Sequence, residues 1–188
     1  MSDGRIPKRF ASARIAHVDP KWTAFHQYAE SVIKGKPMLG RGLLLSGPPG
    51  VGKTYAMAAL SKTWGDVMAS SPVFVTAPDF FENCSPFDPV QDEYRDQPWS
   101  KTYCTARWLV INDLGKEDRS GKLSAQVAQR LGRVLRARSE SKLITHITTN
   151  MTGSVMCEEY GESIVSLLHE MVVSISCGGR DRRIQKET

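Results

Sequence analysis

Residues 47 to 54 combine glycines, a lysine and a threonine in the spacing G-x-x-x-x-G-K-T. Glycine has no Cβ atom, so a chain with this pattern can wrap closely around an anion and point several backbone N–H groups at it. In such a P-loop (Walker A motif) the lysine reaches the β- and γ-phosphates of a nucleotide, and the following hydroxyl ligates Mg²⁺. The pattern predicts ATP or ADP and Mg²⁺ as cofactors. We expect the nucleotide to contact Gly47, Pro48, Gly50, Val51, Gly52, Lys53, Thr54 and Tyr55.

A second polar pair follows the apolar run 108–111. Nucleotide hydrolysis needs a group at the end of a neighbouring strand that holds Mg²⁺ and orients water. Asn112 stands where the metal-directing carboxylate is expected, and Asp113 comes next. An asparagine can accept a hydrogen bond from a metal-bound water but brings no negative charge. We therefore predict that Thr54, Asn112 and Asp113 approach the metal, with Asp113 as the base or water-positioning group.

Asn150 follows the predicted strand 143–149, at the edge of a sheet where ligands of open α/β folds bind. One interpretation is a catalytic amide that contacts the terminal phosphate. The other is a turn asparagine that starts the next helix. Under the first interpretation Lys53, Asp113 and Asn150 form the catalytic set.

The elements that position these residues alternate along the chain. Apolar and alternating runs predict strands at 42–46, 73–76, 108–111, 143–149 and 171–176. Helical spacing predicts helices at 20–34, 52–63 and 123–139, and a further helical stretch with a break at Gly161. Residues 84–102 are predicted to form a long loop, whose aromatic residues either stack on bases or pin the loop to the body. The alternation is typical of an α/β protein with a parallel sheet covered on both faces.

The size and composition predict one domain, with residues 1–40 packing on a core of residues 41–188. The chain contains no apolar stretch of membrane-spanning length and no signal peptide, so we expect a cytoplasmic protein without a membrane partner. The four cysteines have no metal-ligand spacing and are expected to be reduced. A net charge of +5 favours an anionic partner.

With these motifs the chain resembles the DnaC/IstB-type ATPases of the AAA+ superfamily, which include bacterial and phage helicase loaders and transposition ATPases. The segments that carry the resemblance cover nearly the whole chain: 6–10, the P-loop with its helix, 109–118, 148–152, 161–163 and 179–183. The resemblance implies an AAA+ core of the ASCE type, a five-stranded sheet in the order 5-1-4-3-2 and a small or absent lid. It also implies that Asn150 is sensor 1 and that Arg183 is the arginine of a terminal Gly-x-Asp-x-Arg segment.

The chain departs from the family pattern at three places. Asn112 replaces an aspartate, and residues 166–168 read Ser-Leu-Leu, with Leu167 where the family carries an arginine finger. Such an arginine contributes about 10³- to 10⁵-fold to turnover, so its absence predicts slow hydrolysis. The P-loop is complete, so we still expect tight nucleotide binding. Family loaders also have an extra N-terminal region that grips the helicase, whereas here the resemblance begins at Ile6. We therefore expect either that the partner is gripped through the core, for example by residues 84–102, or that the partner differs.

Arg130, Arg133 and Arg136 are spaced by three on a predicted helix. Together with Arg183 they are candidates for contacts to phosphate or single-stranded DNA, and the alternative for the helix is an ordinary solvated face. The sequence thus predicts an ATP-binding AAA+ protein, of phage or mobile-element type, that loads or regulates a replicative helicase or a transposase and contacts single-stranded DNA. A monomer and a homo-oligomer both stay open as its oligomeric state. One alternative is a nonhydrolysing adaptor or inhibitor of replication machinery, and another is a small-molecule P-loop kinase.

Overall fold

The structure is a computed structural model, and it describes residues 6–37, 40–84, 98–117 and 123–182. Five parallel strands form one sheet in the order β2-β3-β4-β1-β5. They are β1 Gly42–Ser46, β2 Val73–Thr76, β3 Trp108–Leu114, β4 Ile144–Thr149 and β5 Val172–Ser176. Read from the other edge this order is 5-1-4-3-2, so the predicted α/β class and strand order are confirmed.

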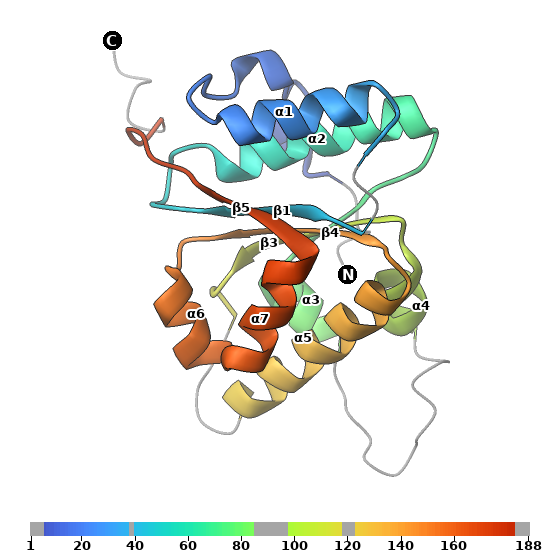
Figure 1. The fold of residues 1–188 in the computed structure, drawn as a ribbon, viewed down its shortest axis with the longest axis vertical. Coiled ribbons are helices and arrows are strands. Elements are labelled where there is room, and N and C mark those ends of the chain that lie inside the picture. Colours follow the sequence, from blue (N-terminus) through green and yellow to red (C-terminus); the bar gives the residue numbers. More distant parts are fainter. Residues whose placement is uncertain (1–5, 38–39, 85–97, 118–122, 183–188) are drawn as a thin grey trace.

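Helices cover both faces of the sheet (Figure 1). One face carries α1 (Thr23–Ile33) and α2 (Lys53–Met68). The other carries the remaining α-helices, which are α3 Ala77–Asn83, α4 Pro98–Thr105, α5 Leu123–Glu140, α6 Gly153–Tyr160 and α7 Glu162–Met171. The break predicted at Gly161 separates α6 from α7.

The core is split by the sheet into two clusters because successive strand side chains point to opposite faces. Leu43 and Leu45 pack with the α1 and α2 layer, whereas Leu44 packs with the α5 to α7 layer. Trp108 and Val110 likewise face the first layer. Because both faces of β1 and β3 are buried, their sequences are nearly continuous apolar runs.

Two short helices were not predicted. After β2, Thr76 caps α3 by accepting a hydrogen bond from the Asp79 backbone N–H at 3.3 Å. Pro78 lies in the first turn of α3, where proline is tolerated because that turn's N–H groups have no intrahelical partner. The prediction of a loop over 84–102 is wrong for residues 98–102, which form α4 together with residues 103–105. Tyr103 is buried against Phe80, as expected for an aromatic that fixes the segment to the body, and residues 85–97 lie outside the described residues.

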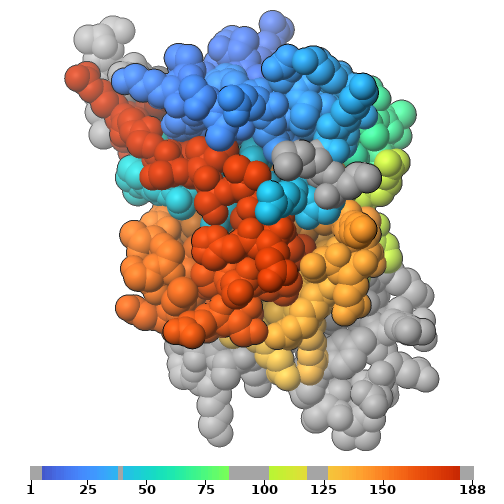
Figure 2. Space-filling model, in the orientation of Figure 1, coloured from blue at the N-terminus to red at the C-terminus, as the bar shows by residue number. Residues whose placement is uncertain are grey.

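The two ends of the described chain meet on the α1 and α2 side. The N-terminal segment forms two single-turn 3₁₀ helices, Lys8–Phe10 and Ile15–His17, before α1 begins. The segment after β5 lies against this N-terminal layer (Figure 2), where the Arg182 guanidinium donates to the His17 carbonyl at 3.1 Å. Among the described residues, no helix has the length and apolar character needed to cross a bilayer.

Candidate functional site

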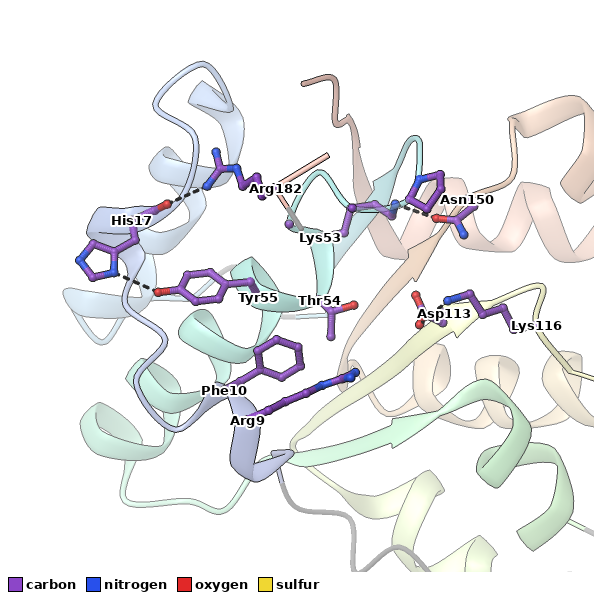
Figure 3. A pocket seen from close by; sticks show the side chains of 13 residues that line it. Arg9, Phe10, His17, Lys53, Thr54, Tyr55, Asp113, Lys116, Asn150 and Arg182 are labelled. Atoms are coloured by element: carbon purple, nitrogen blue, oxygen red, sulfur yellow. Dashed lines mark hydrogen bonds and ion pairs between the residues drawn. The ribbon is translucent and has the colours of Figure 1, made fainter. Parts of the chain in front are cut away.

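A pocket of about 980 Å³ lies at the carboxyl ends of β1, β3 and β4 (Figure 3). This is the edge at which open α/β sheets bind ligands. Its wall comes from the P-loop, from the ends of β3 and β4, and from the two terminal segments. The lining residues are Arg9, Phe10, His17, Pro49, Gly50, Gly52, Lys53, Thr54, Tyr55, Asp113, Lys116, Asn150 and Arg182.

The P-loop backbone uses conformations that suit glycine. Gly50 and Gly52 have φ angles of 82° and 105°, in the left-handed region that side chains rarely adopt. A Cβ atom on Gly50 would also lie 2.0 Å from the Asp181 carboxylate. Gly52 caps α2, so the N-terminus of a 16-residue helix opens onto the pocket and favours an anion there.

Lys53 and Asn150 meet in this pocket. Lys53 is only 5% exposed, and its ammonium donates to the carbonyls of Gly47 and Pro48 at 2.7 Å each and to Asn150 Oδ1 at 2.8 Å. The structure therefore brings together two members of the predicted catalytic set, one from the P-loop and one from the end of β4. Their roles toward a nucleotide stay predictions.

Asn112 and Asp113 separate at an irregularity in the pairing of β3 with β4, between Ile111 and Leu114. Asp113 has a φ of 62° and lies on the pocket wall. Asn112 is 2% exposed, does not line the pocket, and accepts a hydrogen bond from Thr148 Oγ1 at 2.9 Å. Bulges of this kind re-aim side chains next to functional sites. Of the three predicted metal residues, Thr54 and Asp113 are thus on the wall, and Asn112 is held beside Thr148.

No group of three or more His, Cys, Asp or Glu side chains that could hold a metal occurs in the described part of the chain. A Mg²⁺ ion here fits the usual nucleotide-bound kind, in which one or two protein oxygens and the phosphates supply the ligands. Thr54 and Asp113 are the residues that would hold it.

Lys116 is a pocket residue that the sequence analysis missed. Its ammonium forms an ion pair with the Asp113 carboxylate at 2.8 Å. The turn that carries both is fixed by Glu117, which accepts from the Gly115 backbone N–H at 2.8 Å and from the Tyr160 hydroxyl of α6. The usable signal was a lysine three residues after Asp113 in a glycine-containing turn.

The N-terminal segment supplies an aromatic and cationic side of the pocket. The Tyr55 hydroxyl hydrogen-bonds to His17 Nδ1 at 3.0 Å, and Phe10 meets the Tyr55 ring edge-on at 6.4 Å between centroids. The Arg9 guanidinium lies 4.8 Å from the Phe10 ring centroid and extends into the pocket (Figure 3). The sequence predicted only Tyr55 among these, because nothing local indicates that residues 9–17 fold back over α2.

The segment after β5 closes the pocket beside the P-loop. The Arg182 backbone N–H donates to the Gly50 carbonyl at 3.0 Å, and its guanidinium lies 3.5 Å from the Asp19 carboxylate. Arg182 was not predicted, and the predicted Arg183 lies outside the described residues.

The predicted arginine strip lies on α5, away from the pocket. Arg130 reaches the Phe81 carbonyl at 3.4 Å, Arg136 is exposed, and neither these two nor Arg133 line the pocket. A contact of these residues with DNA stays a prediction.

Arg138, on the same helix, is fully buried and has a structural role. It donates to Thr145 Oγ1 at 2.8 Å and to the carbonyls of Tyr103, Ala106 and Ile144 at 2.6 to 2.9 Å. Burial lowers the pKa of this guanidinium to about 10. Arg138 therefore ties α4 and α5 to β4.

Comparison with solved structures identifies the fold. A structure of the DnaC helicase loader matches with a TM-score of 0.75 and 25% identity, covering 92% of this chain and 100% of that one. The chain has a DnaC-like AAA+ fold. A structure of DnaI matches at 0.73 and 22% identity over 94% of both chains. DnaA bound to AMPPCP and single-stranded DNA matches at 0.65 and 12% identity, covering 92% of this chain and 52% of that one. No family model matches the sequence, and a search of curated proteins finds no match.

The family resemblance read from the sequence motifs is thereby confirmed. In the DnaC-like fold of this chain, the hydrogen bond between Lys53 and Asn150 joins the P-loop to the end of β4. The ion pair of Asp113, in β3, with Lys116, in the turn after β3, lies in the same pocket (Figure 3).

Proposed function

We propose that this chain binds ATP with Mg²⁺ in the pocket of residues 47–54 and acts as a nucleotide-dependent loader or regulator of a replicative helicase or a transposase. The observation that carries the proposal is the Lys53 ammonium, held by two P-loop carbonyls and Asn150 beside the N-terminus of α2. A phosphate that enters the loop meets this ammonium, the backbone N–H groups and the helix end together.

The solved relatives support a role in DNA replication. One is described as a helicase loader, and DnaA was solved with AMPPCP and single-stranded DNA. We infer a helicase or transposase partner of the same kind for this chain, with single-stranded DNA as a second ligand. The net charge of +5 and the arginines of α5 fit an anionic ligand.

Two features support slow hydrolysis. Asp113 is the one carboxylate among the described lining residues, and Lys116 is paired with it. Asn112 brings no charge and is hydrogen-bonded to Thr148. These same contacts favour the second candidate, an adaptor that binds nucleotide without turning it over.

Calorimetry with AMPPCP and Mg²⁺ tests the binding proposal on wild type and on Lys53→Ala. We expect binding by the wild type and a loss of at least about 100-fold in the variant, because a charged partner of the phosphates is removed. Lys34→Ala, a change in an exposed ion pair of α1, is the matched control and should bind like wild type. Binding that survives Lys53→Ala would contradict the site.

A mixing experiment with a purified replicative helicase tests the partner. We expect association by size-exclusion chromatography that differs between AMPPCP and ADP, and fluorescence anisotropy should report binding of a single-stranded oligonucleotide. Phosphate release measured in the same mixtures separates the slow ATPase from the adaptor. The helicase-loader role fails if the helicase associates in no nucleotide state.

A further inference from the structure

Lys116 and Asp113 form an ion pair inside the candidate nucleotide site, at 2.8 Å. We propose that Lys116 senses the triphosphate: its ammonium leaves the Asp113 carboxylate for the terminal phosphate of the nucleotide, and a diphosphate leaves the pair intact. The inference rests on the proposed nucleotide site and adds to it the residue that distinguishes ATP from ADP.

The position of Lys116 matches the terminal phosphate rather than the base. The P-loop lysine of such sites reaches the β- and γ-phosphates, and Lys53 here is hydrogen-bonded to Asn150 at the end of β4. β3 is the direct neighbour of β4, and the end of β3 carries Asp113, and the turn after it Lys116, onto the same pocket wall (Figure 3). The aromatic side of the pocket, with Phe10 and Tyr55, comes from other elements.

The backbone that carries the pair is fixed, so only the lysine side chain has to move. The Asp113 N–H donates to Thr148 Oγ1 at 2.8 Å, and the Lys116 N–H donates to the Asp113 carbonyl at 3.2 Å. Glu117 holds the Gly115 N–H at 2.8 Å and also accepts from Tyr160. A reorientation of the Lys116 side chain therefore requires no change in the fold.

The exchange is favoured by charge and by exposure. The side chains of Lys116 and Asp113 are 48% and 24% exposed, and ion pairs that face water contribute little to stability. A terminal phosphate offers more negative charge and forms stronger, charge-assisted hydrogen bonds. The exchange also removes a lysine from Asp113, whose carboxylate then becomes available to a water molecule only when a triphosphate is present.

The family resemblance implies an arginine finger supplied by a neighbouring subunit, whereas Lys116 would supply a cation from the same chain. Residues 166–168 read Ser-Leu-Leu, and Leu167 is partly buried against the α5 to α7 layer. Lys116 accordingly fits nucleotide sensing that does not depend on a second subunit.

Calorimetric titrations with AMPPCP and with ADP, both with Mg²⁺, test the proposal on wild type, Lys116→Met and Lys34→Met. Methionine keeps the apolar stem, and Lys34 with Glu30 is a comparable exposed ion pair on α1, at 2.6 Å. We expect Lys116→Met to weaken AMPPCP binding by about tenfold or more and ADP binding by less than twofold. Lys34→Met should change neither. Equal losses for both nucleotides, or no loss for AMPPCP, would overturn the proposal.

A second pair of variants tests the exchange itself. In titrations without Mg²⁺, where Asp113 has no metal to hold, Asp113→Asn removes the competing partner of Lys116, so AMPPCP should bind more tightly, and the gain should disappear in the double variant Asp113→Asn/Lys116→Met. A gain that persists in the double variant would mean that only repulsion by Asp113 was relieved, which also overturns the exchange. If wild type binds neither nucleotide, the nucleotide site itself fails, a result distinct from equal losses in Lys116→Met. Melting temperatures within about 2 °C of wild type verify that each variant is folded.

Discussion

The ammonium of Lys53 donates to the amide oxygen of Asn150 at 2.8 Å, joining the P-loop to the end of β4 across 97 residues of sequence. In the proposed account a phosphate competes with this amide for the lysine. The strength of the Asn150 contact therefore sets how easily the loop accepts a nucleotide.

A change from Asn150 to Asp tests this competition. A carboxylate 2.8 Å from the buried ammonium would form an ion pair with Lys53 and repel phosphate, so AMPPCP affinity should fall by about tenfold or more. Asn150→Ala removes the acceptor but leaves the carbonyls of Gly47 and Pro48, so its affinity should stay within about threefold. Calorimetry on both variants gives the comparison, and equal affinities would contradict the competition.

Gly50→Ala should damage the P-loop. The new Cβ would lie 2.0 Å from the Asp181 carboxylate, and the φ of 82° costs about 1–2 kcal/mol for an alanine. We expect AMPPCP affinity to drop at least about tenfold, because a side chain disfavours the left-handed backbone of Gly50 and displaces the Asp181 carboxylate. Gly153→Ala, at the first residue of α6 with nothing within 4 Å of the new atom, is the control and should bind normally. Unchanged binding by Gly50→Ala would show that the loop adapts.

The buried guanidinium of Arg138 should contribute more to the free energy of unfolding than the exposed guanidinium of Arg136 on the same helix. Arg138→Met leaves the carbonyls of Tyr103, Ala106 and Ile144 without this donor, and we expect a loss of about 3 kcal/mol or more in urea unfolding. Arg136→Met, on the exposed side of the same helix, should stay within about 0.5 kcal/mol. Similar losses in both variants would rule out the special role of Arg138.

His146 should make the fold sensitive to acid. The imidazole is fully buried, its Nδ1 accepts the Leu43 backbone N–H at 3.0 Å, and burial together with the charge of Arg138 lowers its pKa to about 3. The folded state keeps the ring neutral while the unfolded chain binds a proton below about 6.5, so this stability is complete above pH 6.5 and is lost as the pH falls toward 3.

Glutamine keeps an acceptor for the Leu43 N–H but does not titrate, so His146→Gln isolates the effect. The stability of wild type relative to His146→Gln should fall by about 2 kcal/mol between pH 7 and pH 5. Urea unfolding at the two pH values measures the difference. A constant difference would mean that His146 is protonated in the folded protein or does not contribute.

The P-loop and the approximate positions of the strands were accessible from the sequence because buried parallel strands and glycine-rich loops leave local patterns. The strand order was implied by the resemblance to the AAA+ ATPases and not by any local pattern. The pairing of Asp113 with Lys116 was not, because it depends on a bulge that arises where β3 meets β4. Arg138 looked like one more residue of a charged helix, since its acceptors are carbonyls from distant segments that carry no sequence signal. Helix α4 was missed because its first residues fall in the segment 84–102 that was predicted to be a loop, although Pro98 stands at the first position of the helix, where proline is tolerated.

A crystal structure with AMPPCP and Mg²⁺ tests the central claim most directly. The account predicts that the phosphates lie in the loop of residues 47–54, that Lys53 Nζ leaves the carbonyls of Gly47 and Pro48 for phosphate oxygens, and that Thr54 contacts the metal. A loop that keeps the contacts of Lys53 with Gly47, Pro48 and Asn150 at saturating nucleotide, with no phosphate bound, would contradict it.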